Sequence, residues 1–303
     1  MSTLAESVAR LMRNFSIEIV PREVDGIANL GSALPAATKV YLTRLPKATF
    51  ADTLRAAKRI RSLGLEPVPH MTARTTRDPG ELREHVAALA GDAGVKEVLL
   101  VAGSQRPAGT FERTMQLLET GIFEQAGIER IGVAGHPEGD QQIAAGILQS
   151  ALDEKNAFAR ATGLDLYLVT QFFFDAAPVI RWERRIRERG NRLPVHVGFH
   201  GLTGTTGLLK HALACGIGES IKVLAQHTNV LQLAVVRSPD RLLLEIARTA
   251  ATDPDSCFAK AHFFPLGGFA RTAAWANAIA QGRFTIERDG SLHTYDYDPA
   301  ASR

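Results

Sequence analysis

The stretch Leu166-Tyr-Leu-Val-Thr-Gln-Phe-Phe-Phe-Asp175 joins a short apolar run to two polar residues, three aromatic residues and a carboxylate. Its first four residues are apolar without alternation, which is the pattern of a strand buried on both faces in a parallel sheet. Thr170 and Gln171 end the run. An amide at the end of a buried strand needs hydrogen-bond partners, because burying it without them is costly. Taken alone, such a glutamine more often caps a neighbouring loop than binds a ligand.

The same order of apolar run, turn and helical segment recurs along the chain. The eight runs that we expect to be strands are Ser16–Val20, Lys39–Thr43, Glu66–His70, Lys96–Val101, Arg130–Ala134, Leu166–Gln171, Pro194–Phe199 and Ala261–Phe264. The intervening segments with apolar residues at three- and four-residue spacing are Ala51–Leu63, Pro79–Ala90, Arg113–Gln125, Gln142–Ala161 and Ala177–Arg189. This spacing predicts amphipathic helices. Eight strand–helix repeats predict the α/β class and a (β/α)8 TIM barrel, with residues 1–303 as one domain.

The connection from His200 to Lys260 is too long for one helix, so we expect extra helices between strands seven and eight. They are predicted near Thr206–Cys215, Gly218–Leu224 and Asp240–Thr252. Ser238 or Asp240 can cap the start of the last one. The polar tail, 289–303, predicts either an added hairpin or a loose end.

A doubly wound open sheet is the competing architecture, and it is expected to carry a glycine-rich phosphate loop after its first strand. Here the first strand runs into Val20-Pro21-Arg22-Glu23, which contains no glycine. The sequence therefore favours the barrel.

The composition, 45% hydrophobic and 22% charged, is typical of a soluble globular protein with a sizeable core. The net charge is only +3, and the densest basic run, Arg181–Arg189, contains Glu183 and Glu188, as a solvated helix face does. A nucleic-acid partner is therefore not expected. The two cysteines, Cys215 and Cys257, lack metal-ligand spacing, so no metal site is expected. With no secretory segment at its start and no apolar run that could cross a bilayer, the protein is expected to be cytoplasmic and free of membranes.

The ends of the strands are where a barrel gathers its functional residues. In the first strand, alternation sends Ile17 and Ile19 to one side and Glu18 to the other, toward the barrel interior. A carboxylate there is costly unless it is paired or its pKa is raised, and a raised pKa is what a general acid needs near neutral pH. The alternative is an edge residue paired with an arginine.

Several of these strand ends resemble blocks of the methylenetetrahydrofolate reductase family, in the same order along the chain. The family's signature is similar to Thr-Gln-Phe-Phe-Phe-Asp at 170–175. Weaker matches are Ser16-Ile-Glu-Ile-Val20, Pro69-His-Met-Thr72, Ala102-Gly-Ser104, Gly135-His-Pro-Glu138 and His262-Phe-Phe264. The resemblance covers roughly Ser16 to Trp275. His262 at the last match is expected to be a hydrogen-bonded core residue.

The resemblance implies roles for residues of this chain. Glu18 would be the acid that assists opening of the folate imidazolidine ring, and Gln171, with Thr170 and Ser104, would bind the pterin. The residues expected to bind FAD are Thr43, His70, Ala102, Gly103, Ser104, His136, Glu138, Asp140 and Lys155. For Lys155, a surface lysine is the open alternative, and a single histidine such as His70 is more often structural.

The chain also departs from the family pattern. Ser104 replaces an aspartate that reaches flavin and pterin in most members, and His136 replaces a tyrosine. Asp140 stands where many members have a histidine, and Gly267-Gly268 replaces the usual Asn-Arg. The substitution at Ser104 removes a negative charge that disfavours anionic reduced flavin, which predicts a more oxidising flavin and a bias toward methyltetrahydrofolate oxidation.

The resemblance therefore implies an enzyme of one-carbon metabolism and methionine biosynthesis. It would interconvert 5,10-methylene- and 5-methyltetrahydrofolate through FAD, with NADH or NADPH as co-substrate. The implied partner is folate, polyglutamylated or not, and a homo-oligomer is compatible with the sequence. The alternatives left open are a flavin-independent reductase that uses NADH, and a folate-binding barrel without catalysis. A barrel lyase or aldolase would need a lysine or a carboxylate-held metal at a strand end, and the sequence shows neither.

Overall fold

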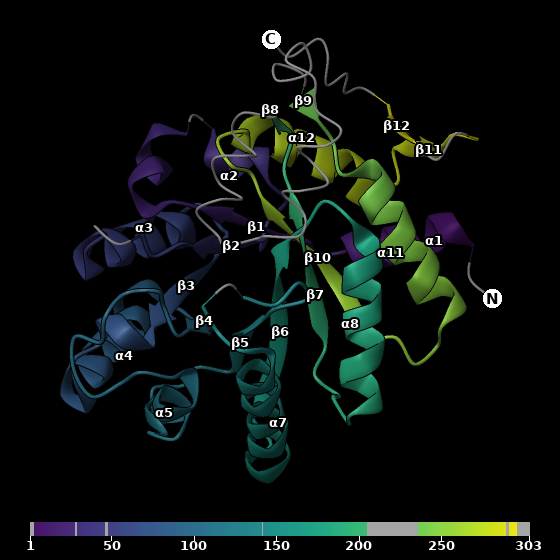
Figure 1. The fold of residues 1–303 in the computed structure, drawn as a ribbon. Coiled ribbons are helices and arrows are strands. Elements are labelled where there is room, and N and C mark those ends of the chain that lie inside the picture. The colour runs from purple at the N-terminus through teal and green to yellow at the C-terminus, as the bar shows by residue number, and fades with distance from the viewer. Residues whose placement is uncertain are drawn as a thin grey trace. The chain divides into compact units, whose positions relative to one another are not determined.

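The computed structural model describes residues 3–27, 29–45, 48–140, 142–204, 236–288 and 291–295. Its main sheet is a closed barrel in the strand order β1-β10-β7-β6-β5-β4-β3-β2, labelled in Figure 1. The strands are β1 (Ser16–Ile19), β2 (Lys39–Leu42), β3 (Glu66–Thr72), β4 (Glu97–Val101), β5 (Arg130–Gly135), β6 (Asp165–Phe172), β7 (Val195–His200) and β10 (Phe258–Phe264). Each expected strand is present to within a few residues, and the predicted (β/α)8 barrel is confirmed.

One helix, α1, precedes the first barrel strand, and the other helices lie between the barrel strands or after the last one. Their bounds are α1 (Leu4–Met12), α2 (Leu30–Ala33), α3 (Phe50–Ser62), α4 (Pro79–Ala93), α5 (Thr114–Leu118), α6 (Ile122–Gln125), α7 (Ala145–Thr162), α8 (Ala176–Glu188), α11 (Asp240–Thr252) and α12 (Phe269–Ala280). Side chains cap several of the starts, as Thr49 does for α3 and Asp78 for α4. The prediction of a single helix over Arg113–Gln125 is wrong, because two helices, α5 and α6, occupy this segment. Gly121, at a φ of 65°, separates α5 from α6, because glycine adopts this left-handed conformation without strain.

The connection between β7 and β10 is described only in part. The helices expected near Thr206–Cys215 and Gly218–Leu224 lie outside the described residues. The third, α11, has the predicted bounds. The predicted side-chain cap of α11 is wrong: the N-cap is Pro239, and the hydroxyl of Ser238 instead donates to Asp240 Oδ2 at 2.7 Å.

Short additional strands lie outside the barrel. The pair β8 (Thr203–Gly204) and β9 (Val236–Arg237) is antiparallel, and so is the pair β11 (Phe284–Ile286) and β12 (Leu292–Thr294). The second pair is a hairpin that includes the described part of the tail, 291–295. The rest of that tail, residues 289–290 and 296–303, lies outside the described residues.

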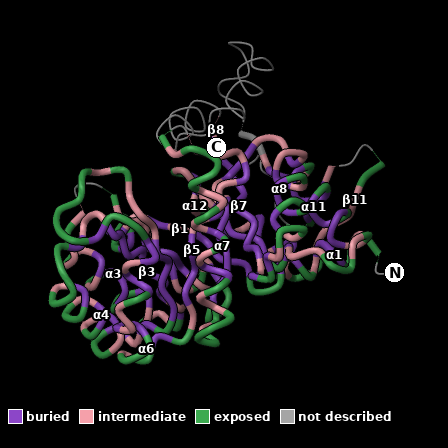
Figure 2. Tube along the Cα trace, turned by 60° about the horizontal axis from the view of Figure 1, so that its bottom comes forward, coloured by how far each residue is buried: buried purple, intermediate pink, exposed green. Residues whose placement is uncertain are grey.

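The chain divides into two compact units. The Gln171 unit consists of Met1–Ile17, Gly135–Leu152 and Val169–Arg303, and the Glu18 unit consists of Glu18–Ala134 and Asp153–Leu168. In the Gln171 unit, α1 packs beside α11 and against β10 (Figure 1). Figure 2 shows the barrel strands as mainly buried and the helices as exposed on one side, which is how amphipathic helices cover a parallel sheet.

No helix among the described residues is long and apolar enough to cross a membrane.

Candidate functional site

Glu18 lies near the end of β1, and its carboxylate meets side chains from the two strands that follow in the chain. Ile17 and Ile19 are buried on the other side of the strand, as the alternation predicts. The Thr43 hydroxyl, directly after β2, donates a short hydrogen bond to Glu18 Oε1. Glu18 Oε2 lies 3.9 Å from Nε2 of His70 on β3. The Glu18 and His70 side chains are only 11% and 10% exposed, so both groups are largely shielded from water.

Tyr41 is a further member of this group that the sequence analysis does not single out. Its ring meets the His70 imidazole edge-on, at a centroid distance of 6.1 Å and an interplanar angle of 84°. Its position two residues before Thr43 is the signal that could have found it, because side chains at i and i+2 of a strand share a face. The second strand therefore supplies one contact to Glu18 and one to His70.

The loop after β4 carries Ala102, Gly103 and Ser104. Backbone hydrogen bonds join it to the loop after β3, and we call residues 102–108 the fastened loop. The N–H of Arg74 donates to the Ala102 carbonyl at 3.0 Å, and the N–H of Ala108 donates back to the Arg74 carbonyl at 2.8 Å. Gly103 has a φ of 89°, and a Cβ there would lie 2.4 Å from Cγ2 of Thr72. Only glycine fits this position, since both the conformation and the space exclude a side chain. Ser104 is exposed on the fastened loop.

Lys155 lies on α7 and is 8% exposed, so the alternative of a surface lysine is wrong. Burial lowers the pKa of its ammonium group to about 8, although the neighbouring Glu154 carboxylate acts in the opposite direction. A buried amine in this state gains from an anionic ligand, which would restore the interactions that burial removes. The side chain is therefore suited to holding a phosphate group.

In the Gln171 unit, Thr170 is built into the sheet. The residue is 1% exposed. Its hydroxyl accepts a hydrogen bond from the N–H of Gly198 on β7 at 2.8 Å and donates one to the Gln171 carbonyl at 2.9 Å. A Cβ at Gly198 would lie 2.4 Å from the Thr170 carbonyl oxygen and 2.8 Å from that of Gln171. The close approach of β7 thus requires glycine and fixes the backbone that carries the half-buried Gln171 side chain.

Aromatic side chains surround the end of this strand. Phe174, Phe264 and Leu266 are partly buried and pack against Phe172. The same Cβ position at Gly198 would lie 2.8 Å from the Phe264 ring, so this ring lies close to the Gln171 backbone. Leu266 has a φ of 50°, in the left-handed region that leucine rarely adopts. An apolar aromatic surface next to an amide is the usual composition of a site for a flat polar ring.

The segment after β5 carries His136, Glu138 and Asp140, all half-buried. The N–H of Gly139 donates to the His136 carbonyl at 3.1 Å, and Asp140 Oδ1 accepts the N–H of Gln142 at 2.8 Å. Both bonds form tight turns, which hold this segment in place. His262 is fully buried, and its Nδ1 lies 3.0 Å from the Ser16 hydroxyl, as expected of a hydrogen-bonded core residue.

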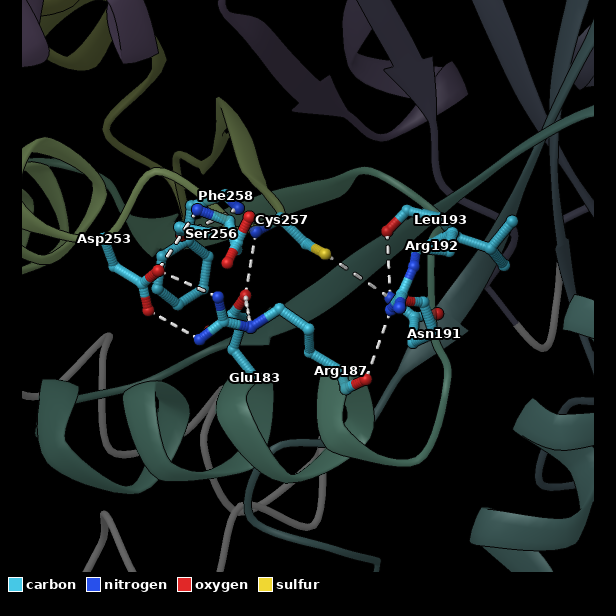
Figure 3. Close-up of polar contacts among 10 residues, drawn as sticks. Glu183, Arg187, Asn191, Arg192, Leu193, Asp253, Ser256, Cys257 and Phe258 are labelled. Atoms are coloured by element: carbon cyan, nitrogen blue, oxygen red, sulfur yellow. Dashed lines mark hydrogen bonds and ion pairs between the residues drawn. The ribbon is translucent and has the colours of Figure 1, made fainter.

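A separate polar cluster joins α8 to the segment before β10 in the Gln171 unit (Figure 3). Arg187 forms a bidentate ion pair with Asp253 at 2.8 and 2.5 Å, and the buried Glu183 accepts the N–H of Cys257 at 2.8 Å. Burial and then the Glu183 charge raise the pKa of the Cys257 thiol, which keeps it protonated and unreactive. This cluster is structural. Across the described ranges, no group of three or more His, Cys, Asp or Glu side chains is placed to hold a metal ion.

The family model described as methylenetetrahydrofolate reductase matches residues 4–228. An uncharacterized protein from Clostridium thermocellum that binds two copies of 5-methyl-5,6,7,8-tetrahydrofolic acid is similar in fold. It has a TM-score of 0.58 and 11% sequence identity, with 92% of this chain and 98% of that chain covered. Oxaloacetate acetylhydrolase has a TM-score of 0.47 and 11% identity, with 92% and 86% covered. The likeness to the methyltetrahydrofolate-binding protein shows the fold alone.

Proposed function

Because this chain belongs to the methylenetetrahydrofolate reductase family, we propose that it interconverts 5,10-methylenetetrahydrofolate and 5-methyltetrahydrofolate. FAD would be the bound cofactor, and NADH or NADPH the co-substrate. The observation that carries this proposal is the position of Glu18, a shielded carboxylate with the Thr43 hydroxyl on one oxygen and His70 near the other. The methyltetrahydrofolate-binding protein from Clostridium thermocellum adds support, since it has a similar barrel.

Glu18 would exchange a proton with N10 of the folate. Thr43 donates to Oε1, so the proton is expected on Oε2, the oxygen that faces His70. Protonation of N10 weakens its bond to the bridging carbon and opens the five-membered ring, and in the reverse direction the Glu18 carboxylate takes the proton back. His70 could replace the proton that Glu18 has given up.

Gln171 would orient the pterin. An amide offers one acceptor and two donors, and this matches the mixed donors and acceptors on the edge of a pterin. Thr170 would act through the backbone rather than by contact, because its hydroxyl already joins β6 to β7. The partly buried rings of Phe174 and Phe264 would pack against the flat rings of the folate.

The residues that would hold FAD fit an anionic, ring-bearing cofactor. Lys155 is a buried amine suited to a phosphate, and Gly103 lets the loop after β4 pack closely against Thr72, which fixes the backbone that carries Ser104. In the Glu18 unit, Thr43, His70, Ala102 and Ser104 would also contact FAD, and in the Gln171 unit the residues proposed for this role are His136, Glu138 and Asp140. When bound, FAD supplies hydride transfer between the nicotinamide and the folate.

The two halves of the reaction test this proposal separately. We expect Glu18→Gln to slow folate turnover about 100-fold or more, because a general acid contributes about 10²–10⁴ to the rate. Reduction of the bound flavin by NADH, followed by stopped-flow absorbance, should change little. Glu18→Asp, which keeps the acid but shortens it, is the matched control and should retain more turnover. Equal loss of both half-reactions would count against the assigned role.

A flavin-independent reductase is a second candidate, favoured by the residues that depart from the family pattern. Ser104 replaces an acid that contacts flavin in most members, and Gly267-Gly268 replaces an Asn-Arg pair. In this variant, hydride would pass directly from NADH to the folate. The visible spectrum of the purified protein decides between them: flavin bands support the first candidate, and a colourless protein that still turns over supports the second. Binding of methyltetrahydrofolate with no turnover would indicate a folate-binding barrel.

A further inference from the structure

A cluster of charged and phenolic side chains, with Tyr41, Glu97 and Tyr167 buried and Lys39 and Arg130 half-buried, lies near the starts of four strands in the Glu18 unit. It contains Lys39 and Tyr41 on β2, Glu97 on β4, Arg130 on β5 and Tyr167 on β6. The Lys39 ammonium group forms a short ion pair with Glu97, and Arg130 Nη1 lies 3.7 Å from Glu97 Oε2. Burial acts to raise the pKa of Glu97, but Lys39, Tyr167 and Arg130 outweigh it and lower that pKa. Glu97 is therefore a fixed negative charge inside the unit.

The hydrogen bonds of the two tyrosines have a defined direction. The Tyr167 hydroxyl donates to Glu97 Oε1 at 2.7 Å, and the two tyrosine oxygens lie 2.7 Å apart. Burial raises the pKa of both phenols, so each keeps its single proton. Since Tyr167 uses its proton on Glu97, Tyr41 must donate to Tyr167. The direct distance from the Tyr41 hydroxyl to Glu97, 3.5 Å, is too long to compete.

This chain of bonds ends at a ring that touches the candidate site. Tyr41 is fully buried, and its ring meets His70 edge-on. His70 in turn lies 3.9 Å from the carboxylate of Glu18. An edge-to-face contact holds its partner in one orientation only if the first ring is itself fixed. The Tyr41 ring is fixed by its hydroxyl, which is hydrogen-bonded to Tyr167 and through it to the ion-paired carboxylate of Glu97.

We propose that Tyr41 is a positioning residue that holds the His70 imidazole beside Glu18, and that Glu97 anchors it through Tyr167. The use made of this geometry rests on the proposed function, in which Glu18 and His70 handle the proton. The geometry itself does not depend on that function. Removing the Tyr41 hydroxyl would leave the ring volume unchanged but release its anchored end, so His70 would sample more orientations.

The chain contains a matched control for this contact. His293 and Tyr295 form another edge-on pair, with centroids 6.4 Å apart and an angle of 80°. Tyr295 is 46% exposed, so its ring is not held in a buried network. Tyr295→Phe therefore reports what the loss of a tyrosine hydroxyl does to a neighbouring imidazole when no anchor is lost.

The experiment is a nitrogen-15 NMR measurement of the histidine rings in the full-length protein, with the His70 resonances assigned by His70→Gln. In Tyr41→Phe, we expect the His70 resonances to shift and broaden, while in Tyr295→Phe those of His293 keep their positions. Tyr167→Phe should move the His70 resonances in the same direction. If Tyr41→Phe does not give a cooperative thermal transition, Tyr167→Phe decides. Unchanged His70 resonances in a folded variant of either kind overturn the proposal.

Kinetics provide a second readout that a purely structural role would not move in this way. Tyr41→Phe should lower kcat of the folate half-reaction by about three- to tenfold with little change in KM, because misplacement of a proton-handling group slows the chemical step rather than binding. An equal change in kcat and KM contradicts the positioning role. If the wild-type protein shows no folate turnover, the proposed function fails, and the NMR result still decides the role of Tyr41.

Discussion

The N–H of Gly198 donates a hydrogen bond of 2.8 Å to the hydroxyl of Thr170, so the residue that precedes Gln171 is joined to the next strand of the barrel. The bond is fully buried, and no side chain larger than hydrogen fits at Gly198. Gln171 is therefore carried by a backbone that two strands hold together. Thr170 and Gly198 belong to the support of the candidate site rather than to its surface.

Thr170→Val tests this support. The variant keeps the shape of the side chain but leaves the Gly198 N–H without its acceptor, at a cost of about 1–3 kcal/mol for a buried donor. We expect the free energy of unfolding, measured with urea, to fall by that amount. Thr170→Ser retains the hydroxyl and should lose less. An unfolding free energy unchanged in Thr170→Val would show that the bond does not stabilise the strand end.

Glu97 should make the protein sensitive to acid. Its folded-state pKa is lowered, so the stability it contributes is present above its unfolded pKa of about 4.3 and is lost as the pH falls through the folded value. We expect Glu97→Gln to destabilise the protein by about 1–3 kcal/mol at neutral pH, because the partly exposed ammonium of Lys39 loses its buried partner. Thermal melts from pH 7 to pH 3 should show a smaller loss in this variant than in the wild type. Parallel loss in both proteins would contradict the prediction.

We expect the buried ammonium of Lys155 to lower the stability of the cofactor-free protein. Burial lowers its pKa to about 8, so below that pH the folded protein carries a buried ammonium at a cost that the unfolded chain does not have. Stability should rise as the pH increases from 8 toward the unfolded pKa, because the folded protein then releases this proton and the unfolded chain keeps it. Lys155→Met should stabilise the cofactor-free protein at pH 7 by about 1–3 kcal/mol. The same variant should bind FAD at least about tenfold more weakly, measured by flavin fluorescence. Stabilisation without weaker flavin binding would remove Lys155 from the proposed cofactor site.

Ser104 should set the potential of a bound flavin. Introducing a carboxylate with Ser104→Asp places a negative charge on the fastened loop, which disfavours the anionic reduced flavin. We expect the midpoint potential, measured by spectroelectrochemistry, to fall in this variant, and methyltetrahydrofolate oxidation to slow. Ser104→Asn, which has a similar size and no charge, is the control. A potential that does not fall in Ser104→Asp would reject the idea that the substitution favours oxidation.

Two predictions from the sequence, a single helix over Arg113–Gln125 and a side-chain cap for α11, are wrong for physical reasons. The break at Gly121 divides a segment whose apolar spacing is continuous, and a single glycine inside such a pattern is a weak signal. Neither Ser238 nor Asp240 caps the start of α11. Asp240 is already the first residue of the helix, and its carboxylate accepts the hydrogen bond of the Ser238 hydroxyl. Both errors concern one or two residues and leave the order of elements unchanged.

The sequence by itself determined the class of the fold, the eight barrel strands and the side of β1 that Glu18 occupies. These features follow from local periodicity, because every buried strand and amphipathic helix repeats its pattern within a few residues. Only the tertiary structure decided that Lys155 is buried, that the Thr170 hydroxyl is used within the sheet, and that Tyr41 lies against His70. Each of these features depends on contacts with residues that are distant in the sequence. The spacing of residues within one segment does not predict which distant segment will pack against it.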